Sequence, residues 1–511
     1  MAEITIKDFK GVNLKEGLWD QGFSGYASGV DIYGLGDDFT KVSIEGVIQP
    51  ALQLSAMPNA GVLTSVINDF VYYPNTQHVY GIDSGSNANI YYWDQATPQW
   101  KVKHTTVSAG RNLAVYNNTI YFTTVTPGGT DGTANAVLNS SDGTTMTTRV
   151  QTGLIVSEPM PMKIYSGYLF IANGRYVDRY DGSSYQSQKL VLPIDFIIRS
   201  MEVFRDGLYI SADNGYFSRI FIWDGSSPTY TDYVPFPQEQ FAPTLQAAQG
   251  FLWIIGNRGT NANGANSQTT FLTPIYIIQY GAPELLFELP IYRGTAFSPS
   301  YGTAAYQNGV LIASGFDAVV TNEDYTGGIW YIGKDLSTGL FHAVQLFPIF
   351  NKVEVGAIFS SGVTQDANIP NTPVMYVAYN DYAIGRTGIQ IGQAGSSSKI
   401  TNPVGGSFVI WQSLPIDAGS TKRKSWTYIK INMDQMITGQ SIQIQYQKDG
   451  SDSLTILKTF SATTNATDRF LQIPIGITSR TITIRLVIGL TPPLAVPRIH
   501  SFTLYYEPTG E

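Results

Sequence analysis

A repeated pair of apolar strands joined by a tight turn constrains the fold of this chain more than any other feature. Each copy is an apolar run, a two-residue polar or glycine turn, and a second apolar run ending in small residues. The second turn residue falls at positions 69, 118, 167, 207, 250 and 309, in steps of 40 to 59 residues. Turns such as Asn-Gly and Asp-Gly favour two-residue hairpins, because both central residues need positive φ. The sequence therefore predicts a series of β-hairpins, and a poorer seventh copy places its second strand at Val374–Tyr379.

A third strand follows several of these hairpins and ends in an aromatic residue and a turn-forming aspartate. The aspartates are Asp94, Asp181 and Asp224, and a fourth, more variable strand comes after them. Four short strands in each period of about 40 to 50 residues indicate a β-propeller, because one four-stranded blade cannot bury both faces alone. About seven blades are expected, with six or eight as alternatives. The rival fold is a right-handed β-helix, which would repeat at half this period or less and lack the hairpin turns.

The alternation of apolar and polar residues becomes strict beyond the Gly-, Ser- and Pro-rich linker 396–406. A period of two indicates antiparallel strands with one face on a core and the other in water. Residues 407–511 are therefore predicted to form a jelly-roll-like β-sandwich, after a propeller over residues 57–395. The whole chain is predicted to be all-β.

Residues 1–56 fit neither unit, because glycines interrupt every apolar run. We expect an extended N-terminal arm that needs a surface to lie on, either its own propeller or a neighbouring subunit. The stretch from Lys41 to Leu54 could add a strand to a sheet. The large aromatic side chains of the arm are the candidate assembly-interface residues, namely Phe9, Trp19, Phe23 and Tyr26.

Composition excludes several classes of function. The chain has no cysteine, which removes disulfides, cysteine metal sites and thiol catalysis. A net charge of −8 speaks against gripping nucleic acid through its phosphates. The dense basic cluster Lys422–Lys424 is interpreted as a solvated hairpin turn. The first residues do not resemble a signal peptide and no apolar run approaches about 20 residues, so synthesis in a cytoplasm and no membrane insertion are expected.

The residues that usually carry chemistry point to no enzyme, cofactor or metal site. No two of His78, His104, His342 and His500 are spaced as metal ligands on one element, and three of the four, which precede or lie inside β-runs, are interpreted as strand residues. A turn role explains Asp94, Asp181 and Asp224, because they share one repeat position. The other carboxylates considered for a glycosidase pair are Asp142, Glu284, Glu323 and Asp324. Calcium binding is a weaker alternative to a turn role for Asp324, Asp335 and Asp381. Sugar stacking is a weaker alternative to core or interface packing for Trp19, Trp100 and Trp411.

Short motifs at both ends give the chain a resemblance to a known class of proteins. Asp8–Leu14 followed by Val30–Ile32 looks like the start of tailed-bacteriophage virion proteins, in which a propeller follows and a terminal sandwich often closes the chain. The C-terminal segments Ile416–Gly419, Lys422–Trp426 and Leu504–Pro508 are similar to that sandwich. The resemblance implies a structural tail component of the virion, such as a nozzle, hub or tail-tip protein.

Three hypotheses of function follow. The first is a non-enzymatic tail component that assembles as a homo-oligomeric ring and contacts other virion tail proteins. Its net negative charge would let DNA slide through the ring without binding to the wall. The second is a receptor-binding protein for a host-surface glycan, with exposed aromatics and carboxylates clustered at one loop end. The third is a propeller glycosidase, which needs two carboxylates about 5 to 10 Å apart in a cleft.

Overall fold

The computed structural model describes a chain that is built from β-strands. It describes residues 63–126, 135–258, 273–289, 302–314, 327–334, 341–349, 353–361, 374–381, 386–393, 408–461, 469–490 and 499–509, with gaps of one to three residues, and six short strands between residues 2 and 56. The chain divides into two compact units, of which one contains residues 56–323 and 350–394, and the other residues 1–55, 324–349 and 395–511. No helix occurs among the described residues.

Seven four-stranded sheets, counted over the described residues, match the predicted number of blades. The first contains β7 (Ile67–Tyr73), β8 (His78–Asp83), β9 (Asn89–Asp94) and β10 (Gln99–Thr105). The second contains β11 (Ala109–Tyr116), β12 (Thr119–Thr126), β13 (Asn135–Ser141) and β14 (Met146–Leu154). The third contains β15 (Met162–Tyr165), β16 (Tyr168–Asn173), β17 (Tyr176–Tyr180) and β18 (Tyr185–Val191). The fourth contains β19 (Ile197–Phe204), β20 (Gly207–Asp213), β21 (Ser218–Trp223) and β22 (Asp232–Pro235).

The remaining three sheets keep the same strand order. The fifth contains β23 (Gln240–Ala248), β24 (Phe251–Arg258), β25 (Thr273–Ile278) and β26 (Glu284–Leu289). The sixth contains β27 (Thr303–Tyr306), β28 (Gly309–Ser314), β29 (Gly327–Lys334) and β30 (Phe341–Ile349). The seventh contains β31 (Val353–Ser361), β32 (Val374–Asp381) and β33 (Arg386–Gln393), and β6 (Ser55–Ala56) from the start of the chain is its outer strand.

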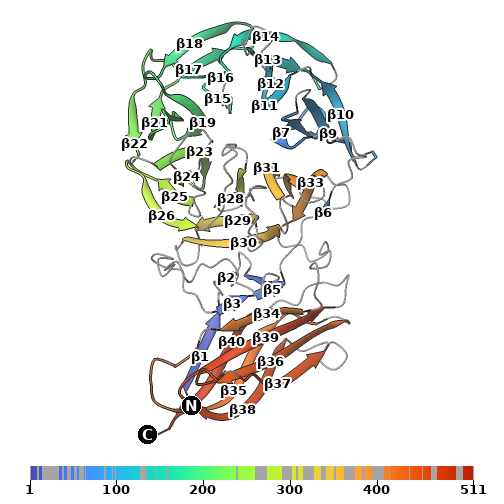
Figure 1. Cartoon of the computed structure of the whole chain (residues 1–511), viewed down its shortest axis with the longest axis vertical. Coiled ribbons are helices and arrows are strands. Elements are labelled where there is room, and N and C mark those ends of the chain that lie inside the picture. Colours follow the sequence, from blue (N-terminus) through green and yellow to red (C-terminus); the bar gives the residue numbers. More distant parts are fainter. Residues whose placement is uncertain are drawn as a thin grey trace. The chain divides into compact units, whose positions relative to one another are not determined.

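These sheets form a closed ring, which confirms the β-propeller. The first strands β7, β11, β15, β19, β23, β27 and β31 lie next to one another in that order, and β31 also lies next to β7. They surround the centre, while β10, β14, β18 and β22 lie at the rim (Figure 1). The last and first blades share a core in which Trp100 of β10 packs edge-on against Tyr376 of β32, with ring centroids 6.1 Å apart.

The second strand of each blade is the most deeply buried, as its sequence predicts. All described side chains after the first in β8 and β16 are buried, as are Phe251–Gly256 of β24. The second strand lies between two strands of its own blade, and the neighbouring blades cover both of its faces. Water therefore cannot reach it from any side. The predicted strand at Val374–Tyr379 lies within β32.

Three predicted turns are displaced. Turns lie as expected at 117–118, 166–167 and 249–250, where Asn117, Asn118, Ser166, Gly167, Gln249 and Gly250 all have positive φ. Asn68 and Asp69, however, lie inside β7, and the chain turns at 74–77 instead. In the fourth blade the turn is Arg205–Asp206, and Gly207 begins β20. In the sixth blade Gly309 likewise begins β28.

Besides β29 and β30, the second unit contains two six-stranded sheets. Five strands of one sheet lie in the order β38 (Phe470–Ser479), β35 (Lys424–Met433), β40 (Ile499–Pro508), β5 (Ile48–Pro50) and β4 (Thr40–Val42), and β1 (Ala2–Lys7) also pairs with β40. The other sheet has the order β2 (Gly11–Asn13), β3 (Gly34–Gly36), β34 (Phe408–Ser413), β39 (Ile482–Leu490), β36 (Gln440–Lys448) and β37 (Thr455–Ser461).

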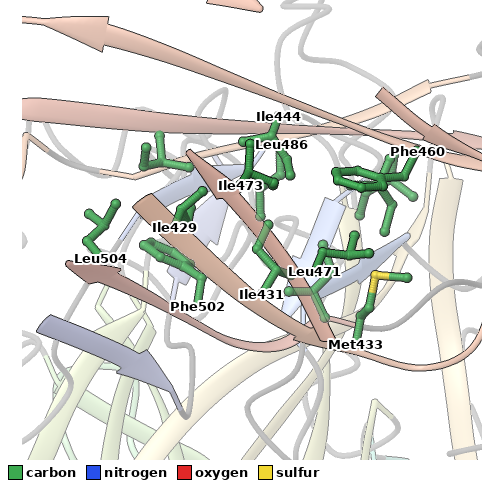
Figure 2. Packing of buried hydrophobic residues seen from close by; sticks show 14 of the residues in the cluster. Ile429, Ile431, Met433, Ile444, Phe460, Leu471, Ile473, Leu486, Phe502 and Leu504 are labelled. Carbon is green, nitrogen blue, oxygen red and sulfur yellow. The ribbon is translucent and has the colours of Figure 1, made fainter. Parts of the chain in front are cut away.

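One apolar core lies between these two sheets. Ile429, Ile431, Leu471 and Phe502 come from the first sheet, and Leu486 from the second (Figure 2). Alternation along β38, and along β35 from Ile429 to Met433, puts every second side chain into this core and its neighbours outside. Side chains of both sheets contribute to this core, while the jelly-roll-like β-sandwich stays a prediction.

The N-terminal segment does not form a separate arm. Strand β1 pairs antiparallel with β40 from Ala2↔Tyr506 to Lys7↔Ser501, and the short strands β2 to β5 join the same two sheets. The stretch expected to supply one strand supplies β4 and β5. The surface that we expected to be the propeller or a neighbouring subunit is therefore the chain's own C-terminal unit, whose sheets offered free edges to pair with.

Candidate functional site on the first strands of the blades

The first strands of the propeller carry a group of polar and charged side chains around the ring. Asp69 is on β7, Asn112 on β11, Lys163 on β15 and Glu202 on β19. These strands belong to four consecutive blades, so the ring closure brings the residues to its inner side. We name this group the axial cluster.

Asp69 joins the first blade to the second. Its Oδ2 accepts hydrogen bonds from the Leu113 amide at 2.9 Å and from Asn112 Nδ2 at 3.2 Å, and its Oδ1 accepts one from the Phe70 amide at 2.9 Å. Burial raises the pKa of the Asp69 carboxyl to about 6, against the opposing effect of these hydrogen bonds and of Lys163.

The same arrangement continues around the ring. Asn112 Oδ1 accepts a hydrogen bond of 3.0 Å from the Met160 amide, which leads into the third blade. Lys163 Nζ lies 2.8 Å from Glu202 Oε2, and this ion pair joins the third blade to the fourth. Asp69, Asn112 and Lys163 thus each bond to a group toward the next blade, and Glu202 accepts from the preceding one, which supplies the partners that buried polar groups require.

The axial cluster was not predicted from sequence. Asn-Asp pairs are typical of turns, so Asn68 and Asp69 were assigned to one. The signal available was the repeat position itself, because Lys163 and Glu202 both stand two residues before the end of a first strand. Opposite charges at equivalent positions of consecutive blades are what an ion pair between blades needs.

The turn role of the repeated aspartates is confirmed by their hydrogen bonds. Asp181 Oδ1 accepts from the amides of Ser183 and Ser184 at 2.8 and 2.6 Å, and Asp224 Oδ1 accepts from those of Ser226 and Ser227, both at 2.7 Å. Asp94 accepts from Ala96, Thr97 and Lys101. Hydrogen bonds hold the pKa of all three carboxyl groups below the usual range. The bond with the largest effect comes from Lys101 for Asp94, from the Ser184 amide for Asp181 and from the Ser227 hydroxyl for Asp224.

The other candidate carboxylates are spread along the chain. Asp142 Oδ1 accepts from the Thr145 amide at 2.6 Å within its turn, and Glu284 is an exposed residue at the start of β26. Glu323, Asp324 and Asp335 lie outside the described residues, and Asp381 ends β32. Within the part of the chain that the structure describes, no three His, Asp or Glu side chains gather as a metal site.

All four histidines lie in strands, where the sequence predicted three of them to precede or lie inside strands. His78 begins β8, His104 is in β10, His342 in β30 and His500 in β40. His104 Nε2 is 3.0 Å from Ser141 Oγ, and His500 Nε2 is 2.8 Å from Asp434 Oδ1. Burial lowers the pKa of both His78 and His104.

The candidate aromatic residues have mixed outcomes. Trp100 is fully buried, so packing rather than sugar stacking is its role. Trp411 is in β34, which the structure describes only as backbone at this position. The interface candidates Phe9, Trp19, Phe23 and Tyr26 lie outside the described residues, and their role in assembly stays a prediction.

The basic cluster is only partly a solvated turn. Lys422 and Arg423 are exposed, but Lys424 at the start of β35 is 2% exposed. Its ammonium group donates to the carbonyl oxygens of Ser420, Lys422 and Arg480. Three acceptors match the three donors of an ammonium group, so the buried head group has a full set of hydrogen-bond partners.

Comparisons with known proteins leave the function open. No protein-family model and no curated protein matches the chain. The exo-β-1,3-galactanase of Phanerochaete chrysosporium, solved with galactose, is 8% identical with a TM-score of 0.32, covering 89% of this chain and all of its own. The RRP9 WD40 repeats are 9% identical with a TM-score of 0.42, covering 68% of this chain and 99% of their own. A Bacillus subtilis arabinoxylan arabinofuranohydrolase of glycoside hydrolase family 43 is 11% identical with a TM-score of 0.24, covering 78% of this chain and 95% of its own.

These likenesses are too distant to indicate an activity, and the propeller assignment rests on the sheets themselves. Over the described residues, no helix is long and apolar enough to cross a membrane.

Proposed function

We propose that the chain is a non-enzymatic structural component of a bacteriophage tail, of the nozzle, hub or tail-tip type, that assembles through subunit interfaces. The virion assignment comes from the resemblance of the terminal motifs. The observation that carries the assembly role is an exposed apolar patch on the propeller. Homo-oligomerisation, contacts with other tail proteins and passage of DNA through a lumen belong to the same proposal.

The patch lies where the third and fourth blades meet. Ile194 is 73% exposed, Tyr216 72% and Ile155 46%. The segments that carry them lie close together, because Ile155 contacts Gly174, the Ile198 amide donates to the Gly174 carbonyl, and the ring of Phe217 lies 5.8 Å from that of Phe196. Contiguous exposed apolar side chains mark interaction surfaces in soluble proteins.

The axial cluster supports a structural role rather than hydrolysis. A glycosidase is the second candidate, because the raised pKa of Asp69 is what a general acid needs and Glu202 is also on a first strand. Both oxygens of Asp69 already accept hydrogen bonds from the next blade or its own strand. Glu202 is paired with Lys163 and accepts from the Val203 amide. The carboxylates of Asp69 and Glu202 are thus occupied by hydrogen bonds and an ion pair between or within blades, and they are poorly placed to reach a substrate.

The mass of the full-length protein in solution tests the proposal. Light scattering should give a homo-oligomer, and Ile194→Glu should shift it toward monomer by placing a charge in the interface. Ile456→Glu, at a 58% exposed position of β37, is the matched control and should keep the wild-type mass. A monomeric wild type would contradict self-assembly, and an unchanged mass of Ile194→Glu would contradict this patch as the interface. Hydrolysis of a glycan that is lost in Asp69→Asn would favour the glycosidase.

A further inference from the structure

The outer face of the first six-stranded sheet carries aromatic and hydrogen-bonding side chains in two adjoining rows. In the register of β38, β35, β40 and β1, one row is Pro474, Tyr428, Tyr505 and Glu3. The next row is Gln472, Lys430, Thr503 and Thr5. Their neighbours Ile429, Leu504 and Ile473 point into the core, so these two rows point away from it.

A β-bulge puts Tyr428 on this face. Trp426 is fully buried, and two residues later an undisturbed strand would point to the same side. The register shifts between Trp426 and Tyr428, so that Tyr428 lies opposite Tyr505 instead. Their rings are stacked, with centroids 4.1 Å apart and planes at 21°.

A second aromatic group borders the polar row. Phe470, at the start of β38, is 60% exposed, and Lys430 Nζ lies 5.5 Å from the centre of its ring. Gln472, Lys430 and Thr5 are exposed, and Thr5 Oγ1 lies 3.0 Å from Thr503 Oγ1. Four strands spaced about 4.8 Å apart make each row about 14 Å long, the length of a short oligosaccharide.

The charges of the two rows select the kind of ligand. They hold one ammonium group, Lys430, and one carboxylate, Glu3, so these two rows carry no net charge. An anionic polymer would need clustered Lys and Arg. A protein interface would be depleted in Lys and Glu, which are both present here. An uncharged polymer rich in hydroxyl groups fits, because its sugar rings have apolar C–H faces that stack on aromatic rings and hydroxyls that bond to amide and hydroxyl side chains.

We propose that this face binds a neutral oligosaccharide, with the Tyr428–Tyr505 pair and Phe470 as stacking platforms and Gln472, Lys430 and Thr503 as hydrogen-bonding groups. The site goes beyond the proposed assembly role and does not depend on it. It would give a structural component a second function, adhesion to a neutral surface polysaccharide.

Affinity electrophoresis of the full-length protein tests the proposal. Native gels contain dextran, laminarin or galactan as neutral probes, or alginate as an anionic probe. The wild type should be retarded in at least one neutral gel and not selectively in alginate. Phe470→Ala should weaken that retardation at least tenfold in apparent Kd, because the ring is exposed and contributes contact area rather than folding. Tyr280→Ala, which removes a 77% exposed aromatic residue of the propeller outside the assembly patch, is the matched control and should bind like the wild type.

Tyr428→Ala is the second variant, and its melting temperature separates lost binding from lost folding. No retardation in any neutral gel, equal retardation of Phe470→Ala and wild type, or retardation in alginate alone would each overturn the proposal. Light scattering of the same samples keeps this outcome separate from the assembly role, because Phe470→Ala should leave the oligomeric mass unchanged.

Discussion

At the scale of single residues, the Asp69 carboxyl shows how burial and hydrogen bonding oppose each other. Burial disfavours the charged form, while amide donors from its own strand and from the next blade favour it, and burial is the larger effect. The pKa of about 6 therefore exceeds the ordinary value of 3.8. Because the folded-state pKa is raised, the stability linked to this group is present below about pH 4 and is lost as the pH rises through 6.

This linkage predicts a difference in pH dependence between wild type and Asp69→Asn. The free energy of unfolding of the wild type should fall relative to the variant, by up to about 3 kcal/mol, between pH 4 and 7. Urea unfolding followed by tryptophan fluorescence at several pH values measures it. Asp232→Asn, at an exposed position, is the control. Parallel pH profiles of wild type and Asp69→Asn would contradict the raised pKa.

At the scale of elements, four consecutive blades are joined by one contact that is repeated three times. The tyrosine that ends each first strand donates to a carbonyl in the hairpin turn of the next blade: Tyr73 to Asn118, Tyr116 to Gly167 and Tyr165 to Asp206, at 2.7, 2.7 and 2.6 Å. A glycine of positive φ in the following Asp-Gly turn lies against the same ring, at Gly143, Gly182 and Gly225. The Asp-Gly pair is thus both a turn and the site where a neighbouring blade packs.

This contact predicts the cost of removing one hydroxyl group. Tyr116→Phe should lower the free energy of unfolding by about 1 kcal/mol, because the Gly167 carbonyl loses its donor. Chemical denaturation of the propeller measures the change. Tyr216→Phe, which removes the hydroxyl of a 72% exposed side chain, should change stability by less than about 0.5 kcal/mol. Equal effects of the two substitutions would show that the hydrogen bond between blades contributes nothing.

Local pattern predicted most strands, and it failed where distant contacts decide the structure. The turns at 117–118 and 249–250 follow from residues that tolerate positive φ, which is local information. Asn68 is a residue type that is common in turns, but it lies inside strand β7. Its side-chain amide donates a hydrogen bond to the Gly110 carbonyl oxygen in the next blade. The axial cluster was missed for the same reason, since each member is explained by a partner about 40 residues away in sequence.

At the scale of the whole molecule, each unit contains segments from distant parts of the chain. The N-terminal residues pair with the last strand, and β6 completes the seventh blade. No local sequence pattern indicates a pairing such as Ala2↔Tyr506, so the sequence alone predicted a separate N-terminal arm. The consequence is practical, because deleting residues 1–56 would remove strands from both six-stranded sheets and could not test assembly alone.

Substitutions in β1 should therefore destabilise one unit and spare the other. Ile4 packs against the core between the two six-stranded sheets, whereas Thr5 is exposed. Ile4→Asp should increase hydrogen exchange in Lys424–Met433 and Ile499–Pro508 and leave Tyr168–Asn173 of the propeller protected, because a buried charge weakens only the core that it enters. Thr5→Asp should leave all three segments as in the wild type. Faster exchange in Tyr168–Asn173 as well would show that the two units unfold together, and unchanged exchange everywhere would place β1 outside the sandwich.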